Sequence, residues 1–411
     1  MSSASTINLA PLLKIIYPNG IAFAAYKRSR FLAMVQKDTK FGGDSRYVVL
    51  DEAGVNGGSS DFATALANVG NATPVRFQVH HKKEYQIVQL QGDLIARSMG
   101  NTNAIMSALK HQFDKADYNF GRALGARVWG GAGGRLGVIS GATTSATITL
   151  ATAADASRFE VGMWCQFSVD DGTPASPAGL RGSGAQLQIT AITRTTSTGT
   201  ATLTFSAAVN TVTGTVSGDS IFRSGDYANT MTGVAGWVPV SNPTGGESFH
   251  GVDRSLGDMQ RRSGIRVSGG GASKEETLIT ASARAFDQAS ECDTVFLNPL
   301  DQGELIKEVG SKRVIDVNTD TPGIGFRALE VDGAGGVLKC VAEVDVPRGY
   351  AWMVKMDDWA LRTAGECPRF LDEDGVGKLL RVANDDAYQA RMGAYGNLFC
   401  ENPGGQVAIT W

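Results

Sequence analysis

The residues of this chain that could carry chemistry are few and widely spaced. Four histidines occur, and two of them, His80 and His81, are adjacent, so on an extended strand their side chains point to opposite faces. The other two, His111 and His250, are far away in the sequence. The five cysteines form no Cys-x-x-Cys pair. These spacings predict neither a metal site nor a disulfide framework, and we expect no metal and no cofactor.

The glycine and carboxylate motifs also lack the surroundings that catalysis requires. The glycines at 130–134 and 269–271 stand in no phosphate-binding or dinucleotide-binding pattern. The adjacent carboxylates at 357–358 and 385–386 are a common surface pattern, and nothing places them in a cleft. The stretch Asp372-Glu373-Asp374-Gly375 is similar to the start of a calcium loop, but the later ligand positions are missing. The sequence therefore predicts no catalytic residue and no enzyme.

Positive charge is most concentrated between residues 254 and 266. The chain as a whole has a net charge of -3 and a pI near 5.9, which argues against a strong electrostatic grip on nucleic acid. A solvated or inter-subunit salt-bridging face explains this run better, and any contact with DNA should be weak and non-specific. The candidates for contacts between subunits are Lys82, Lys83, Glu84, Arg254, Arg261, Arg262 and Arg266.

The composition is that of a globular protein. With 411 residues, 42% hydrophobic and 19% charged, the chain is long enough for two or three hydrophobic cores. No apolar run approaches the roughly 18 residues of a membrane span, and no basic leader precedes the short apolar segment at 9–17. We therefore expect a protein without membrane contact that stays in the compartment where it is translated.

The strongest structural pattern is an apolar stripe that predicts a helix from Asn103 to Trp129. Its members recur at three- and four-residue steps: Ile105, Leu109, Phe113, Ala116, Phe120, Leu124 and Val128. Such a helix would be about 40 Å long and could brace a whole domain. The glycines at 130–134 should end it.

The residues before this helix predict a projecting arm. A strand candidate at 46–50 is followed by a loop and by a small helix that Asp61 would cap. The stretch from Val75 to Leu90 is extended, with a polar middle between apolar ends, and is interpreted as a two-stranded arm. An isolated hairpin is marginal in water, so such an arm makes physical sense if another subunit receives it.

The rest of the chain predicts an inserted β domain and a mixed α+β part. Residues 137–223 are rich in Thr, Ser, Ala and Gly, and their short, regularly spaced strands indicate a small sandwich or barrel. The expected strands of the insertion are 146–150, 163–169, 187–194, 201–205 and 220–222. Further on we expect strand and turn at 231–240, a glycine-rich loop at 245–271, helices at 275–289 and 301–309, and strands at 294–297, 326–331, 337–343, 350–356, 359–362 and 406–411.

The order of these parts resembles the major capsid protein of tailed double-stranded DNA bacteriophages, the Hong Kong phage capsid fold. The supporting motifs are Phe62-Ala63-x-Ala65, Tyr85-Gln86-Ile87, Met231-Thr232-Gly233-Val234, Gly251-Val252-Asp253-Arg254-Ser255, Val295-Phe296-Leu297-Asn298-Pro299 and the segment 326–358. Each motif is weak alone, and their order and spacing carry the resemblance. It covers nearly the whole chain outside residues 137–223.

The resemblance implies a division of the chain. Residues 1–40 would be the N-terminal arm, 41–92 the extended loop, 93–136 the spine helix and start of the peripheral domain, 137–223 the inserted all-β domain, 224–276 the return of the peripheral domain with a glycine-rich loop, 277–366 the axial domain, and 367–411 the C-terminal strands. Some relatives crosslink covalently through a loop lysine; Lys82 or Lys83 could sit there, but nothing identifies the partner asparagine.

The implied function is that of a non-enzymatic shell protein. It would self-assemble into hexamers and pentamers of an icosahedral head that encloses double-stranded DNA, in the host cytoplasm, and would reside in the virion. The implied partners are other copies, a portal protein, a separate scaffold protein and a possible decoration protein on the insertion.

Two other functions stay open from the sequence. A phage tail or baseplate component would also use Thr/Ser/Gly-rich β modules. An extracellular glycan-binding protein or hydrolase would fit the β-rich insertion, but lacks a leader peptide and a carboxylate pair.

Overall fold

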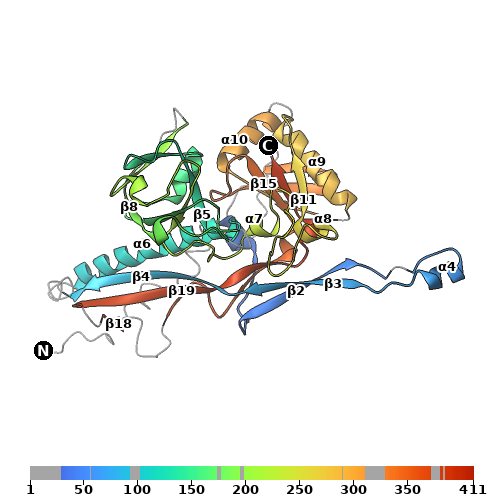
Figure 1. Cartoon of the computed structure of the whole chain (residues 1–411), viewed down its shortest axis with the longest axis horizontal. Helices are drawn as coiled ribbons and strands as arrows, with labels where there is room; N and C mark the ends of the chain where they lie inside the picture. Colours follow the sequence, from blue (N-terminus) through green and yellow to red (C-terminus); the bar gives the residue numbers. More distant parts are fainter. Residues whose placement is uncertain are drawn as a thin grey trace.

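A computed structural model describes residues 29–55, 57–92, 102–173, 177–194, 199–288, 290–310, 329–371, 380–382 and 385–411. A long ribbon of strands runs along one side of the molecule, and two compact bodies stand on it. One body is a β-barrel, and the other is a mixed sheet covered by helices (Figure 1). The α+β architecture with a separate all-β unit is therefore as expected.

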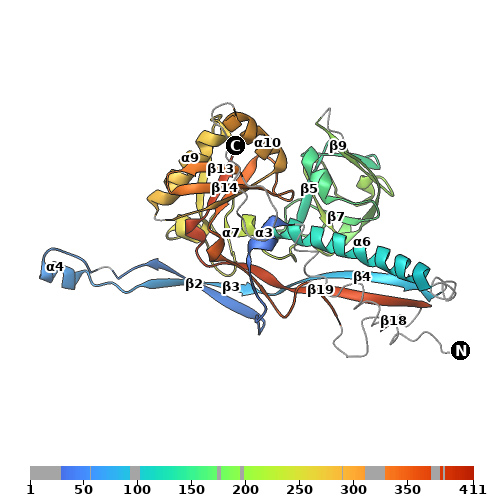
Figure 2. The same ribbon diagram turned by 180° about the vertical axis from the view of Figure 1, so that it is seen from behind.

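The long helix α6, Thr102–Val128, lies along the ribbon below the barrel, as seen from both sides (Figures 1 and 2). The sequence prediction is confirmed to within one residue at each end. Phe113, Phe120 and Leu124 are buried, which offsets the helix-propensity cost of the two glycines within it. A Cβ at Gly125 would lie 2.3 Å from the carboxylate of Asp345, so this carboxylate would have to move to admit a side chain there.

The ribbon corrects the prediction for residues 75–90. Strand β3, Thr73–His80, pairs with β2, Ser45–Ala53, whereas β4, Lys82–Gln91, pairs over its whole length with β19, Ala387–Cys400. Only His81 separates β3 from β4, and no turn-forming residue stands there, so the chain continues in one direction. The projecting arm is therefore β2 with β3, joined by a loop that carries α4, Phe62–Ala67. Asp61 caps α4, as predicted.

Strands were expected within residues 367–411, but the long strand β19 at Ala387–Cys400 was not predicted as such. Its 14 residues include Gly393 and Gly396, and its buried positions do not alternate with exposed ones. Both features hide a strand from periodicity analysis. β19 is the centre of a six-stranded sheet whose other members are β1 Gln36–Asp38, β16 Trp359–Thr363, β17 Arg369–Phe370, β18 Leu380–Arg381 and β4.

The mixed sheet has the order β11-β20-β15-β12-β14-β13. Its strands are β11 Ile265–Ser268, β20 Val407–Thr410, β15 Tyr350–Val354, β12 Thr294–Leu297, β14 Gly336–Ala342 and β13 Leu329–Gly333. Two helices, α9 Lys274–Asp287 and α10 Pro299–Gly310, contact this sheet and share a hydrophobic core with it. The side chain of Ser273 accepts a hydrogen bond from Glu276 N and caps α9.

The barrel is closed by six strands in the order β10-β5-β6-β9-β8-β7. They are β5 Arg135–Ser140, β6 Thr147–Leu150, β7 Trp164–Ser168, β8 Leu187–Arg194, β9 Ala201–Phe205 and β10 Ser220–Arg223. Five of them match the expected segments closely. The sixth, β5, starts directly after the glycines at 130–134 and was not expected. Short 3-10 segments lie at Ala153–Arg158, Arg181–Gly184 and Val209–Thr211 within this unit, and at Met356–Asp358 and Pro403–Gly405 elsewhere.

Two further predictions need correction. Residues 231–240 contain a short helix, α7 Val234–Trp237, in place of a strand, because Trp237 turns inward and is fully buried. The expected loop at 245–271 contains α8, Met259–Ser263, and the strand β11. Near the N-terminus the sequence predicts a helix through Tyr26, Phe31, Leu32 and Val35; α3 spans Arg30–Met34, and Tyr26 lies outside the described residues. The calcium-like stretch at 372–375 and residues 326–328 also lie outside them.

Candidate assembly surface

The tip of the arm carries an exposed apolar stripe. Phe62 and Leu66 are 81% and 64% exposed, and Val69 is similarly exposed. The three are spaced by four and three residues, so they lie on one side of α4 and of the turn that follows it. None of the residues of α4 is buried. Large apolar side chains that gather on one exposed surface mark an interaction site.

The shaft of the arm has one covered and one open face. Val48, Phe77 and Val79 are buried. The Phe77 ring packs edge-on against Trp237 of the body, with ring centroids 5.5 Å apart. On the opposite face Tyr47 and Val49 are more than half exposed. The body therefore covers one face of the β2–β3 pair and leaves the face with Tyr47 and Val49, and the tip, open.

The end of the β2–β3 pair that leads into the tip loop is tied to the body by the arginines of α8. The guanidinium of Arg262 donates to the carboxylate of Glu52, near the end of β2, and both side chains are 12% exposed. Arg261 Nη1 donates to the backbone oxygen of Glu52 at 2.8 Å. The hydrogen bond from Arg262 is the main cause that lowers the pKa of Glu52. Two of the candidate inter-subunit arginines thus fix the arm within one chain.

The other two arginines of this run also have partners within the chain. Arg254 is almost fully buried, pairs with Glu247 and donates to the backbone oxygen of Gly236 at 2.6 Å. Arg266 donates to the backbone oxygen of Ser241 at 3.0 Å, and burial lowers its pKa. A role between subunits stays a prediction for all four arginines. Among the four, Arg261 is the best placed to contact a neighbouring subunit, because its side chain is 56% exposed.

The three candidates on β4 differ from one another. Lys82 Nζ donates to Asn229 Oδ1 at 3.3 Å, and burial lowers the pKa of this lysine. Lys83 is exposed. Glu84 belongs to a largely buried ion cluster with Arg127, Arg223 and Asp226, in which Arg223 Nε contacts Asp226 Oδ2 at 2.8 Å. The cluster joins the ribbon, α6 and the barrel, so Glu84 stabilises the single chain. Of the three, Lys83 is best placed to meet a neighbour.

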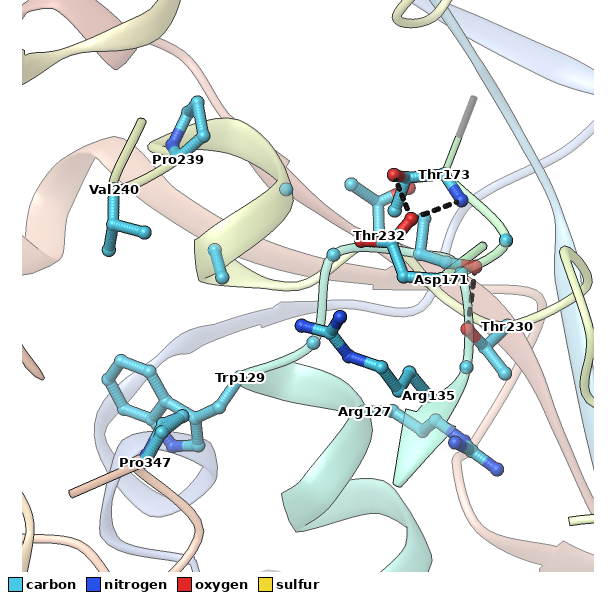
Figure 3. Close-up of a pocket in the computed structure, with 18 of the residues that line it drawn as sticks. Arg127, Trp129, Arg135, Asp171, Thr173, Thr230, Thr232, Pro239, Val240 and Pro347 are labelled. Carbon is cyan, nitrogen blue, oxygen red and sulfur yellow. Dashed lines mark hydrogen bonds between the residues drawn. The ribbon is translucent and has the colours of Figure 1, made fainter. Parts of the chain in front are cut away.

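A crevice of about 800 Å³ lies between the barrel, the end of α6 and the mixed-sheet body. Figure 3 shows Arg135 extending into it, whereas Arg127 turns away. Burial lowers the pKa of His250, on its wall, to about 4. Its carboxylates have partners: Asp155 pairs with Arg158 at 3.6 Å, Asp171 accepts from Thr173 Oγ1 at 2.5 Å, and Glu247 pairs with Arg254. Within the described residues, the crevice presents no pair of unpartnered carboxylates of the kind that glycoside hydrolysis uses.

The part of the chain that the structure describes has neither a metal-binding cluster nor a membrane-spanning helix. Among the residues that the structure describes, no group of three or more His, Cys, Asp or Glu side chains is placed to hold a metal ion. No helix in this part of the chain is long and apolar enough to cross a bilayer.

The sequence reasoning passed over the tip residues themselves. Phe62 entered it only as part of a motif, and Leu66 and Val69 were not singled out. The signal was present, because the spacing of Phe62, Leu66 and Val69 is that of one helical face. The helix α4 has six residues, and none of them is buried by the part of the chain that the structure describes.

Comparison with known proteins gives matches only among solved structures. No family model and no curated protein sequence matches this chain. The capsid asymmetric unit of cyanophage A-1(L) matches with 10% identity and a TM-score of 0.46, covering 95% of this chain and 92% of that chain. A structure of Mycobacterium phage Ogopogo matches with 9% identity and a TM-score of 0.43, covering 93% and 92%. The holo-SrpI encapsulin complex from Synechococcus elongatus PCC 7942 matches with 7% identity and a TM-score of 0.41, covering 93% and 86%.

The first two of these structures are from phages. Similarity at this level of identity and TM-score does not establish a function. The function is therefore inferred from the geometry of the chain itself.

Proposed function

We propose that this protein is the self-assembling shell subunit of a bacteriophage-type capsid. One observation carries the proposal: the chain extends an arm whose tip helix buries none of its residues and exposes Phe62, Leu66 and Val69. A six-residue helix is far too short to be stable alone in water. A second copy of the chain that covers the stripe would supply the missing burial.

The reciprocal exchange of such arms would link many copies. Each copy would give one tip and receive another, and a contact of this kind between different surfaces propagates into rings or larger closed assemblies. The β2–β3 pair supports this role, because the Phe77–Trp237 packing and the Arg262–Glu52 contact near its loop end hold its direction. A tip whose orientation is fixed before binding loses less conformational freedom on assembly.

The finer features of the proposed function come from the resemblance. We expect hexamers and pentamers in an icosahedral head around double-stranded DNA, assembled in the bacterial cytoplasm. We expect a portal protein, a separate scaffold protein and a possible decoration protein on the barrel. The net charge of -3 supports weak, non-specific contact with the packaged DNA. An enzymatic role is not part of the proposal.

Electron microscopy of the purified protein tests the proposal. We expect closed shells of uniform size, with the protein alone or when it is co-expressed with a phage scaffold protein. Tubes or open rings would favour the tail or baseplate alternative. A protein that stays monomeric under both conditions would contradict the proposed function.

A further inference from the structure

The crevice between the barrel and the mixed-sheet body has an apolar end. Pro239, Val240 and Pro347 line this end, and Val240 is 37% exposed. Figure 3 shows the guanidinium of Arg135 directed toward the same end. A concave space of several hundred cubic ångströms, with an apolar wall and a few convergent polar groups, is the usual form of a binding site in a protein. The crevice has this form.

Most charged groups of the crevice are paired within the chain. Four of its arginines each have a carboxylate partner: Arg127 pairs with Asp226, Arg158 with Asp155 at 3.6 Å, Arg254 with Glu247, and Arg348 with Glu304 at 3.0 Å. The carboxylate of Asp171 accepts hydrogen bonds from Thr173 N and Thr173 Oγ1. Burial lowers the pKa of His250 to about 4, so this side chain adds no charge at neutral pH.

Arg135 and Lys82 are the cations of the crevice that form no ion pair within the described residues. Lys82 Nζ donates only to two neutral oxygens. Arg135 acts on Asp155 from a distance: burial raises the pKa of Asp155, and the charges of Arg158 and Arg135 oppose that rise. Together Arg135 and Lys82 outweigh the negative charge of Asp171. The described lining of the crevice therefore keeps a surplus of positive charge.

The lining of the crevice also offers unused hydrogen-bonding groups. Asn242, Thr244 and Ser248 are exposed, and their side chains form no hydrogen bond with the described part of the chain. Amide and hydroxyl groups can donate and accept, which is what the N–H and C=O groups of an extended peptide require. These side chains therefore suit a peptide better than a fatty acid, whose body carries no polar group.

The backbone around the crevice is strained at three positions. Ala132, Ala228 and His250 have φ values of 76°, 53° and 50°, in a region that residues other than glycine rarely adopt, and all three line the crevice. Ser183, in the barrel, is the other such residue that the structure describes. Backbone strain of this kind gathers at ligand-binding sites, so its position agrees with a binding role for the crevice.

We propose that the crevice binds an extended peptide segment of a partner protein in which an acidic residue lies next to apolar residues. The carboxylate pairs with Arg135, whose guanidinium can donate two parallel hydrogen bonds to it. The apolar neighbour packs on Val240 and the two prolines, and the peptide backbone bonds to the unused side chains of the lining. Such a segment complements the crevice in charge. The inference goes beyond the proposed function and does not depend on shell formation.

Selection from a library of short random peptides displayed on phage tests this site. The bait is the full chain with Phe62→Asp and Leu66→Asp, because this variant has no apolar arm tip that could fill the crevice of another copy. The same chain with Arg135→Gln in addition removes peptides that bind to other exposed surfaces. We expect the enriched peptides to share an Asp or Glu beside apolar residues.

Fluorescence anisotropy with the most enriched peptide then measures its affinity. Arg135→Gln and Val240→Glu should each weaken binding at least tenfold, and so should replacing the acidic residue of the peptide by its amide. The matched controls are Arg76→Gln and Val216→Glu, at exposed positions outside the crevice, and they should leave the affinity unchanged.

Four outcomes would overturn the inference. They are a selection without enrichment, equal affinities for Arg135→Gln and Arg76→Gln, displacement of the peptide by acetate or inorganic phosphate at the peptide's own concentration, and enriched sequences that match residues 61–69 of this chain. The third would indicate a site for small anions, and the fourth would assign the crevice to an arm tip. Failure of wild-type protein to form shells would instead count against the proposed function and leave this inference standing.

Discussion

Glu343 is a buried carboxyl group that anchors the start of α3. One of its oxygens accepts hydrogen bonds from Ser29 Oγ at 3.3 Å, Arg30 N at 2.7 Å and Phe31 N at 3.2 Å. These contacts anchor α3, whose Phe31 packs against Trp129 in the main core. Burial, assisted by the nearby charge of Asp345, raises the pKa of Glu343 from its ordinary value to about 7.

This shift predicts a pH dependence of stability. The folded state holds the proton of Glu343 more tightly than the unfolded state, so the free energy of unfolding should fall as the pH rises from about 4.5 to about 7. The loss would amount to roughly 3 kcal/mol over this window. Urea unfolding of unassembled subunits at several pH values measures it.

Glu343→Gln should flatten this part of the profile, because glutamine keeps the oxygen acceptor and does not titrate. Asp117→Asn is a useful companion, since burial raises the pKa of Asp117 to about 6 and its removal should flatten a lower window. An unchanged slope between pH 4.5 and 7 in Glu343→Gln would show that this carboxyl group is not the cause.

At Gly133 the close packing of the backbone predicts that a larger residue destabilises the fold. A Cβ at this position would lie 1.8 Å from the backbone oxygen of Asp171, so the segment that joins α6 to the barrel packs against the loop after β7 without room for it. Gly133→Ala should lower the free energy of unfolding by about 1 to 3 kcal/mol. The control is Gly54→Ala, where a Cβ meets nothing within 4 Å. Equal urea midpoints for the two variants would contradict the tight joint.

At the scale of single elements, a helix or strand could be predicted from the sequence when the contacts that determine it are local. The helix α6 was predicted nearly residue for residue, because its signal repeats over 27 positions along the chain. The pairing of β4 was wrong, because its true partner β19 lies about 300 residues further on and no turn marks the connection. The ion cluster of Glu84, Arg127, Arg223 and Asp226 was equally hidden, since its members come from three distant segments.

The helix α6 also carries a prediction at this scale. Proline at position 109, inside the helix, would remove a backbone hydrogen bond and clash with the preceding turn, at a cost of about 3 kcal/mol. Leu109→Pro should therefore abolish shell formation, as judged by electron microscopy, whereas Leu109→Ala keeps the helical backbone and should still assemble. Shells at wild-type yield from Leu109→Pro would refute the role of α6 as a rigid spine.

At the scale of the whole molecule, the main feature is an arm that projects away from the two compact bodies. Its two bodies have their own hydrophobic cores, and the ribbon passes below both of them, with α6 along one end and the arm projecting from the other (Figure 1). The candidate residues taken from charge alone are mostly engaged within the chain, as Arg254 and Glu84 show. Uncovered apolar surface at the arm tip indicates an assembly surface more directly than the charge pattern does.

The most direct test of this conclusion is the assembly state of a tip variant. Phe62→Asp with Leu66→Asp places two charges on the exposed stripe and leaves the core of the chain untouched. Analytical ultracentrifugation should show this variant as folded, unassembled subunits or small oligomers, while wild-type protein and the barrel variant Val161→Asp sediment as shells. Shells from the tip variant at wild-type yield would contradict the claim that the arm tip binds a neighbouring copy.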